Sequence, residues 1–387
     1  MDPTIFFSGG FLLLLLLGSA DALTSASDVA ALKAFKAGVN PRSIPPWSCL
    51  ATWDFAAADP CASPRRTHFT CGVTCSPDST RVTQLTLDPA GYSGRVTPLV
   101  SGLTHLLTLD LAENSFFGQI PPSISSLVNL QFLNLRSNSL SGSLPESITR
   151  LNSLESIDIS HNSLTGSLPK SMGSMPNLRR LDLSYNKLTG SIPKLPKNLI
   201  ELALKANSLS GSVPKDSFTD STQLEVVEIA ENSFTGVLGA WFFLLPSIQQ
   251  ADLANNSLTG VEVSPPSPAG SSGDLVAVEL GFNAIEGHAP ANFAAYPRLS
   301  SLSLRHNRLR GGIPAEYGQS KTLRRLYLDG NFLTGKPPAG FIRPDSPVYG
   351  SFGDNCLQGC PGNSKMCAPS QKPFSICKQA YGGKPRS

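Results

Sequence analysis

Five histidines and a recurring row of carboxylates are the residues of this 387-residue chain that could carry out catalysis. The histidines are His68, His105, His161, His288 and His306. None of them lies in an H-E-x-x-H zinc motif, and the sequence has no G-x-S-x-G nucleophile elbow. The carboxylates lie between paired leucines, at Asp110, Asp158, Asp182, Glu228, Asp252 and Glu279. Two neighbouring carboxylates can hydrolyse glycosides, but this regular recurrence indicates a structural repeat. We therefore expect no catalytic activity, no metal ion and no cofactor.

The first 22 residues have the features of a secretory signal peptide. A short apolar run, Phe11 to Leu17, precedes Ala20 and Ala22, small residues that signal peptidase prefers, so cleavage is predicted after Ala22. The run is shorter than the roughly 18 apolar residues that a membrane span needs, and no later segment qualifies. The mature chain is therefore predicted to be secreted, with no direct membrane span.

Eight cysteines fall into two groups near the two ends of the mature chain. They are Cys49, Cys61, Cys71 and Cys75, and then Cys356, Cys360, Cys367 and Cys377. Each group contains a C-x-x-x-C pair that could be part of a zinc site, but neither has a well-spaced second pair of cysteines or histidines. Because a secreted chain passes through an oxidising compartment, we expect all eight to form structural disulfides.

Between the two cysteine groups the sequence repeats with a period near 24 residues. The segment Leu109 to Asn114 returns as Leu133 to Asn138 and as Leu181 to Asn186. The recurrent asparagines are Asn114, Asn138, Asn162, Asn186, Asn207, Asn232, Asn256, Asn283, Asn307 and Asn331, and an earlier copy has Ala90 instead. This L-x-x-L-x-L-x-x-N pattern predicts eleven leucine-rich repeats.

The repeat pattern predicts an α/β solenoid. Alternating leucines place one face of a short strand in the core and the other in solvent, and stacked copies form a parallel concave sheet over a continuous core. Apolar residues such as Ile120 and Ile124 predict a short helical turn on the convex side. We expect the asparagine amides to satisfy backbone groups of the turn that leaves each strand.

An L-x-G-x-[ILV]-P element recurs, for example at Leu140–Pro145, Leu164–Pro169 and Leu188–Pro193. It resembles the plant-specific class of leucine-rich repeats, which includes receptor-kinase ectodomains, receptor-like proteins and polygalacturonase inhibitors. The segments Asp28–Gly38 and Gly72–Cys75 are similar to the N-terminal cap of that class, although Thr70 stands where the family has tryptophan.

The resemblance implies the disulfide Cys61–Cys75, which leaves Cys49 to pair with Cys71, whereas the four C-terminal cysteines allow three connectivities. We expect a signal peptide at 1–22, a disulfide-linked cap at 23–80, eleven repeats at 81–340 and a cysteine-containing cap and tail at 341–387. No kinase domain is recognisable in the sequence.

The outward side chains of the repeat strands are expected to form one concave surface that is acidic in its middle and basic near its C-terminal end. Candidate partner contacts on it are Tyr185, Glu228, Asp252, Phe282, Arg305, His306, Arg324 and Tyr327. Aromatic and arginine residues dominate binding energy at interfaces, whereas charge complementarity sets orientation and association rate. For any single residue, the alternative is an ordinary solvated side chain.

Two repeats depart from the pattern. In one, Gly239 replaces the proline, and Trp241, Phe243 and Leu244 occupy positions that elsewhere hold Ser, Gly or Lys. One interpretation is an exposed apolar patch on the convex side, used for a partner or dimer contact, and the other is a rotated turn that buries these residues. The next repeat carries a Pro- and Ser-rich insert at 264–273, expected to be a flexible loop. Asn255 is the only N-glycosylation acceptor.

These features predict a secreted leucine-rich-repeat protein that binds a protein or peptide partner in the plant apoplast or cell wall. The favoured role is a receptor-like recognition or co-receptor module, with a membrane receptor kinase or a secreted hydrolase as partner. The alternative role is inhibition of a pathogen's cell-wall-degrading enzyme, as in polygalacturonase inhibitors. A structural wall component is a third possibility, and a formal net charge of +3 argues against nucleic acid.

Overall fold

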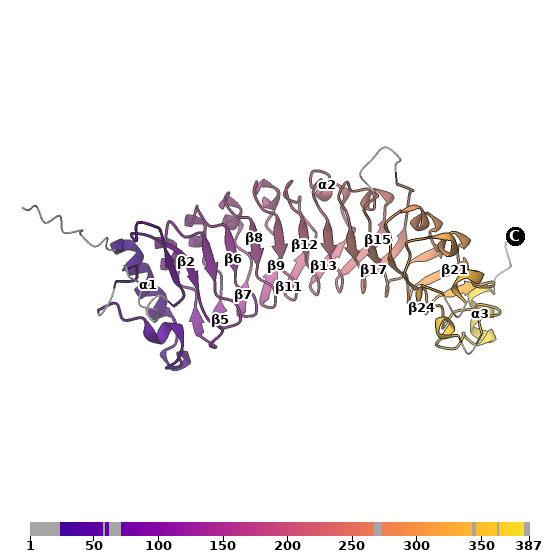
Figure 1. Cartoon of the computed structure of the whole chain (residues 1–387), viewed down its shortest axis with the longest axis horizontal. Coiled ribbons are helices and arrows are strands. Elements are labelled where there is room, and N and C mark those ends of the chain that lie inside the picture. Colours follow the sequence, from indigo (N-terminus) through magenta and orange to yellow (C-terminus); the bar gives the residue numbers. More distant parts are fainter. Residues whose placement is uncertain are drawn as a thin grey trace, which may run out of the picture.

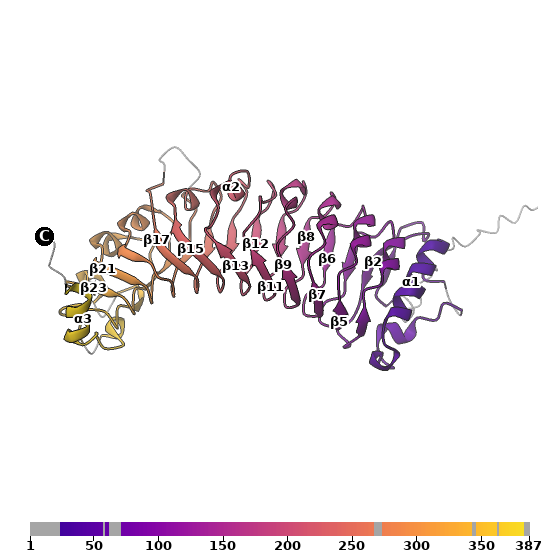
Figure 2. The same ribbon diagram turned by 180° about the vertical axis from the view of Figure 1, so that it is seen from behind.

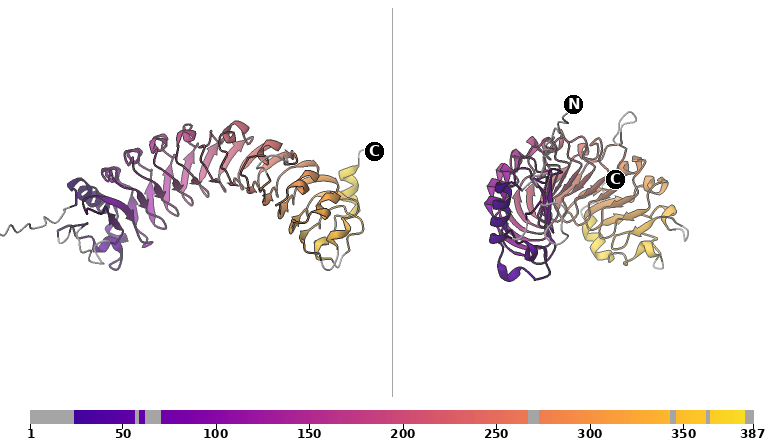
Figure 3. Two further views of the ribbon diagram at one scale, coloured as in Figure 1. Left: turned by 45° about the horizontal axis from the view of Figure 1, so that its top comes forward. Right: turned by 60° about the vertical axis from the view of Figure 1, so that its left-hand side comes forward.

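The structure is a computed structural model that describes residues 24–56, 59–61, 71–266, 273–342, 346–361 and 364–382. The predicted signal peptide, His68, Thr70 and most of the insert at 264–273 lie outside these residues. Repeats stack side by side between helix α1 (Ala26–Gly38) at one end and helix α3 (Phe374–Tyr381) at the other (Figure 1). The stack bends into an arc (Figure 3).

The main sheet contains thirteen strands in the described chain, parallel from β2 onward and antiparallel between β1 and β2. Its strands are β1 (Val73–Cys75), β2 (Val82–Thr86), β4 (Thr108–Asp110), β6 (Phe132–Asn134), β8 (Ser156–Asp158), β10 (Arg180–Asp182), β12 (Glu201–Ala203), β14 (Val226–Glu228), β16 (Gln250–Asp252), β18 (Ala277–Glu279), β20 (Ser301–Ser303), β22 (Arg325–Tyr327) and β24 (Tyr349–Ser351). The predicted α/β solenoid with a parallel sheet is confirmed.

A second row of strands lies beside the main sheet along the solenoid, as both face views show (Figure 2). It consists of β3 (Ser93–Arg95), β5 (Ser115–Gly118), β7 (Ser139–Gly142), β9 (Ser163–Gly166), β11 (Lys187–Gly190), β13 (Ser208–Gly211), β15 (Ser233–Leu238) and β17 (Ser257–Val261), followed by a separate sheet of β19 (Glu286–His288), β21 (Arg308–Gly312) and β23 (Phe332–Thr334). Strands β7, β9, β11, β13 and β21 overlap the L-x-G-x-[ILV]-P elements of their repeats.

Short helical turns complete the repeats and the caps. Most are 3-10 turns: η1 (Pro41–Ser43), η2 (Cys49–Thr52), η3 (Pro98–Gly102), η4 (Pro122–Ser126), η5 (Glu146–Arg150), η6 (Met172–Ser174), η7 (Ala240–Phe242), η8 (Ala291–Ala295), η9 (Ala315–Gln319), η10 (Ala339–Phe341) and η11 (Lys365–Cys367). Helix α2 (Lys215–Phe218) takes the place of such a turn in one repeat. The prediction of short helical turns is therefore also correct.

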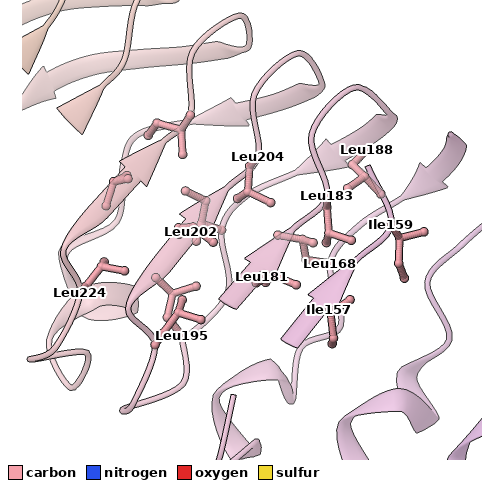
Figure 4. Packing of buried hydrophobic residues seen from close by; sticks show 14 of the residues in the cluster. Ile157, Ile159, Leu168, Leu181, Leu183, Leu188, Leu195, Leu202, Leu204 and Leu224 are labelled. Carbon is pink, nitrogen blue, oxygen red and sulfur yellow. The ribbon is translucent and has the colours of Figure 1, made fainter. Parts of the chain in front are cut away.

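The paired leucines of successive strands pack into one continuous core. Leu181 and Leu183 of one repeat lie beside Leu202 and Leu204 of the next, and all four side chains are fully buried (Figure 4). Each repeat therefore buries its apolar face only against its neighbours, as expected of a solenoid.

The recurrent asparagines form a ladder of hydrogen bonds through the stack. The Asn186 amide donates to the carbonyl of Leu183 at 3.1 Å and to that of Ile159 in the preceding repeat at 3.0 Å. Its Oδ1 accepts the backbone N–H of Leu164 at 2.9 Å. The amide thus satisfies backbone groups of two repeats at once, which confirms the predicted role.

The repeat period continues into the C-terminal cap. Strand β24 pairs in parallel with β22, and the buried Asn355 donates to the Leu328 carbonyl at 2.9 Å and accepts from the Leu333 N–H at 2.9 Å. Asn355 lies 24 residues beyond Asn331, and this spacing equals the repeat period, so the cap contains one more strand of the same kind.

Four disulfides hold the two caps. The pairs Cys49–Cys71 and Cys61–Cys75 are those that the resemblance implied. The C-terminal pairs, which the sequence left open, are Cys356–Cys377 and Cys360–Cys367. All eight cysteines are therefore structural.

The apolar patch expected around Trp241, Phe243 and Leu244 is not exposed, so that interpretation was wrong. Phe243 is fully buried with its ring 5.1 Å from that of Phe293, while Trp241 and Leu244 are partly buried. A Cβ on Gly239 would lie 2.8 Å from the Trp241 ring, so glycine in place of proline lets the ring fold back onto the solenoid. The turn is rotated, as the second interpretation had it. Within the described ranges, no helix is long and apolar enough to cross a bilayer.

Candidate functional site

The register of the main sheet aligns the central outward side chain of each strand into one column. The column runs through Asp110, Asn134, Asp158, Asp182, Ala203, Glu228, Asp252, Glu279, Ser303 and Tyr327. The surface built on this column is called the concave surface here. The structure therefore places these side chains in the row that the repeat alignment predicted.

A second column forms where each strand turns away, at the residue before the repeat asparagine. Its members have positive φ although they are not glycine, for example His161 at 53°, Tyr185 at 56°, Phe282 at 56° and His306 at 49°. Such a backbone is uncommon outside glycine. Neighbouring members of the column stack their rings: those of His161 and Tyr185 are 4.2 Å apart, and those of Phe282 and His306 are 4.5 Å apart.

The concave surface ends in a cluster of four predicted contact residues, Phe282, Arg305, His306 and Tyr327, called the aromatic–arginine cluster below. The Arg305 guanidinium carbon lies 5.0 Å from the centre of the Phe282 ring and 5.7 Å from that of Tyr327. Such contacts stabilise by about 0.5–1 kcal/mol each at partly exposed sites. No hydrogen bond or ion pair to the described chain engages the guanidinium, so its ring contacts alone position it.

Two glycines make room for this cluster. A Cβ on Gly281 would lie 3.0 Å from Cγ of Arg305, and a Cβ on Gly330 would lie 2.4 Å from Nδ1 of His306. Any larger residue at either position would displace the side chain above it. The Arg305 chain therefore lies across Gly281, while the His306 ring lies between Phe282 and Gly330.

Three buried polar atoms in the last two of the cluster's three repeats have no hydrogen-bond partner: Ser303 Oγ, Arg305 Nε and Asp329 Oδ1. Ser303 is only 1% exposed. An unpaired buried polar group costs about 1–3 kcal/mol, so native proteins contain few of them. One end of the concave surface thus contains hydrogen-bond donors and acceptors that have no partner within the described chain.

Asp329 faces the positive side chains of the cluster. Its Oδ2 lies 3.5 Å from Nε2 of His306. Burial raises the pKa of the Asp329 carboxyl above its ordinary value, although a backbone hydrogen bond and the positive charges of His306 and Arg305 act in the opposite direction. The carboxylate is therefore poorly solvated in the free chain.

The middle of the concave surface is acidic, as predicted. Glu228 and Asp252 occupy paired positions on β14 and β16. Burial and then the negative charge of Asp252 raise the pKa of Glu228, and burial raises that of Asp252. Lys205 lies 3.2 Å from Glu231 beside them and neutralises only part of this charge.

Two further predicted contact residues lie apart from both the cluster and the acidic pair. Tyr185 stacks on His161 in an earlier repeat, and its side chain is exposed. Arg324 donates to the carbonyls of Lys321 and Leu323 in its own turn, at 2.9 and 3.0 Å. The predicted glycosylation acceptor Asn255 is exposed in the same positive-φ column as Tyr185.

Sequence reasoning placed Ser303 in the central column without selecting it as a contact residue, and it did not select Gly281 or Gly330. The signal that could have found the two glycines is a glycine one or two residues before the repeat asparagine, as in Gly281-Phe-Asn283 and Gly330-Asn331. The burial of Ser303 had no such signal, because its neighbours decide it. Among the described residues, no group of three or more His, Cys, Asp or Glu side chains is arranged to hold a metal ion.

Comparisons with known proteins agree with this architecture. A family model described as leucine rich repeat matches residues 137–188, and a second model of the same description matches residues 105–127 and 322–343. The chain is a leucine-rich-repeat protein. None of the curated proteins matches the chain.

Among solved structures, the chain resembles plant receptor-kinase ectodomains. It is 32% identical to the plant peptide hormone receptor RGFR1, solved in complex with RGF2, over 68% of this chain and 42% of that one, with a TM-score of 0.63. It is 31% identical to PEPR1, solved with AtPEP1, over 81% of this chain and 46% of that one, with a TM-score of 0.67. The chain thus spans less than half the length of either receptor.

The fold also occurs in a chain of similar length. A plant ice-binding protein has a TM-score of 0.60 and 23% identity, and the match covers 89% of this chain and 99% of that one. At this level of identity the likeness concerns the fold alone. A solenoid of this size therefore exists both within large receptors and as a smaller protein.

Proposed function

We propose that this chain is an extracellular protein that binds a protein or peptide partner along its concave surface, in the plant apoplast or cell wall. The favoured role is a receptor-like recognition or co-receptor module. It acts by binding and not by catalysis.

The observation that carries the proposal is the aromatic–arginine cluster. Its guanidinium contacts two rings and has no hydrogen-bond partner among the described residues, near the end of a surface whose middle is acidic. Arginine and aromatic residues anchor interfaces because they supply large contact areas and directional hydrogen bonds. The plant receptors that the chain resembles were solved with peptides, which supports a peptide or protein as the partner.

The experiment is crosslinking capture with the secreted, tagged chain on intact plant tissue, followed by mass spectrometry. We expect a receptor kinase to be recovered with the wild-type chain and with Arg310→Glu, and to be lost with Arg305→Glu. Arg310 is the matched control because it is exposed on β21, outside the main sheet. A Tyr327→Ala variant should weaken capture in the same way.

Two outcomes would contradict the favoured role. Recovery of a pectin-degrading hydrolase whose activity falls on binding would identify an inhibitor instead. Equal recovery of the receptor kinase by the wild-type chain and by Arg305→Glu would show that the aromatic–arginine cluster does not take part in partner recognition.

A further inference from the structure

The C-terminal cap contains an open cavity of about 550 Å³, called the α3 cavity here. Helix α3, labelled in Figure 1, forms one wall of it. Thr334 at the end of β23 and the segments 356–358 and 371–372 form the rest. Every residue of the wall belongs to the described chain, and none belongs to the aromatic–arginine cluster. The cap therefore has room for a ligand at a place separate from that cluster.

One face of helix α3 borders the cavity. Phe374, Cys377, Lys378 and Tyr381 line it, and their spacing of three and four residues places them on the same side of the helix. A helix in a folded protein normally buries its apolar face. No residue of α3 is buried, however, and Phe374 is 81% exposed. The described chain thus leaves an apolar helix face uncovered at the edge of the cavity.

The segment that follows the helix does not suit this face. Residues 383–387 include Lys384 and Arg386 but no large apolar side chain. The wall already contains Lys372 and Lys378, so two more cations would be repelled. A separate molecule fits this face better than that segment does.

Most polar side chains of the wall already have partners. Those of Thr334, Gln371 and Tyr381 are hydrogen-bonded to backbone groups. Lys372 Nζ lies 2.7 Å from Oδ2 of Asp354, which neutralises its charge. A ligand therefore meets few polar groups in this wall that need a partner.

The rest of the wall is apolar with one unpaired charge. Leu357, the Phe374 ring and the Cys356–Cys377 disulfide supply the apolar part. Lys378 is exposed, and no hydrogen bond or ion pair within the described ranges engages its ammonium. No carboxylate lines the cavity. The wall therefore favours a molecule with an apolar body, which gains free energy on leaving water, and one negative group near Lys378.

We propose that the α3 cavity binds an amphiphilic carboxylate of the fatty-acid class. Its alkyl chain lies against Leu357 and the Phe374 ring, and its carboxylate meets the Lys378 ammonium. The Gln358 side chain, whose amide has no partner among the described residues, donates a hydrogen bond to the same carboxylate. The cavity volume lies within the range of small-molecule sites, roughly 300–1,000 Å³. This site goes beyond the proposed protein or peptide partner and does not depend on it.

The test is isothermal titration calorimetry of the full secreted chain with three probes that share one alkyl chain. The probes are decanoate, which is anionic, decanol, which is neutral, and decyltrimethylammonium, which is cationic. We expect decanoate to bind most tightly and decyltrimethylammonium most weakly, because Lys378 attracts the carboxylate and repels the ammonium. Lys378→Gln should weaken decanoate binding roughly threefold to fivefold and leave decanol binding unchanged.

Two substitutions on helix α3 separate the cavity from the rest of the exposed surface. Phe374→Ala should weaken the binding of both decanoate and decanol roughly tenfold, since it removes a ring that the alkyl chain contacts. The matched control is Ile376→Ala, because Ile376 is 43% exposed on the same helix but does not line the cavity. It should have no effect on either probe. Thermal unfolding verifies that each variant is folded.

Four results would each overturn this inference. They are no binding of decanoate, equal affinities for the three probes, an equal loss with Ile376→Ala, and a decanoate affinity that Lys378→Gln leaves unchanged. A dimer of the wild-type chain that Phe374→Ala abolishes, measured by sedimentation, would assign the apolar face to a second copy and overturn it as well.

Discussion

At the residue scale, the same side chain type can have opposite effects on stability at two positions of this solenoid. Ser221 and Ser303 are both 1% exposed. The Ser221 hydroxyl donates to the Pro196 carbonyl at 2.9 Å, whereas that of Ser303 has no partner. Ser303 lies at the end of strand β20 and Ser221 lies in the turn after helix α2, so the surroundings of each position decide whether its buried hydroxyl is paired.

We therefore predict that Ser303→Ala leaves the free energy of unfolding unchanged or raises it by up to about 1 kcal/mol, because it removes an unpaired buried hydroxyl. Ser221→Ala should lower it by about 1 kcal/mol, because it removes a buried hydrogen bond to the Pro196 carbonyl. Thermal unfolding of the two variants checks this contrast. A clear loss of stability in Ser303→Ala would show that its hydroxyl is paired in solution.

The acidic pair Glu228 and Asp252 gives stability a pH dependence of defined sign. The pKa of Asp252 is raised in the folded chain, chiefly by burial, so the folded state binds protons more readily than the unfolded state. The stability contributed by this group therefore falls as pH rises from the ordinary aspartate pKa through the raised one.

Asp252→Asn keeps the Oδ1 atom that accepts the Ala254 N–H and removes the charge. We expect it to raise the melting temperature at neutral pH, and the gain to shrink as the pH falls through the raised pKa of Asp252, because the wild-type carboxyl then takes up a proton. Melting curves across this range measure the difference. A gain that grows as pH falls would contradict the raised pKa.

At the element scale, the asparagine ladder links each strand to the turn that follows it. The buried Asn331 donates to the carbonyls of Leu304 at 2.9 Å and Leu328 at 3.0 Å, and accepts the Leu309 N–H at 3.0 Å. Because the residue before each such asparagine has positive φ or is glycine, the amide also holds an otherwise unfavourable turn.

We predict that Asn331→Ala lowers the free energy of unfolding by about 2–4 kcal/mol, since several buried backbone groups lose their partners together. The control is Asn129→Ala, which removes one exposed hydrogen bond to the Thr104 carbonyl and should cost less than about 1 kcal/mol. Urea unfolding of both variants provides the measurement. Similar losses in the two variants would argue against a structural role for the ladder.

At the scale of the whole molecule, stability is a sum of contacts between neighbouring repeats. Each end of the solenoid lacks one neighbour and therefore depends on its cap. The repeats contact only adjacent repeats, so disruption of one cap should not reach the other. Hydrogen bonds attach the N-terminal cap to the first repeat. The buried Asp28 accepts from Arg81 Nη2 at 2.8 Å and from the Val82 N–H at 2.7 Å. The C-terminal cap relies on Cys356–Cys377 and Cys360–Cys367.

We predict that the double variant Cys356→Ala/Cys377→Ala increases hydrogen exchange in β22 and β24 and leaves β2 to β8 unchanged. A disulfide typically contributes about 2–4 kcal/mol, which the last repeats would lose locally. Exchange measured by mass spectrometry separates the two ends. A uniform increase along the chain would show that the solenoid unfolds as one cooperative unit.

The sequence by itself determined the repeat, the alternating burial of the leucines, the hydrogen-bonding role of the asparagines and the column of outward side chains. These features follow from a sequence pattern that recurs in every repeat. They therefore depend little on contacts beyond a repeat and its copies on either side. Tertiary structure alone decided the burial of Phe243, the pairing of the four C-terminal cysteines and the unpaired atoms around Arg305. Each of these depends on which side chain of an adjacent repeat or cap fills the space, and a residue's own repeat contains no information about that neighbour.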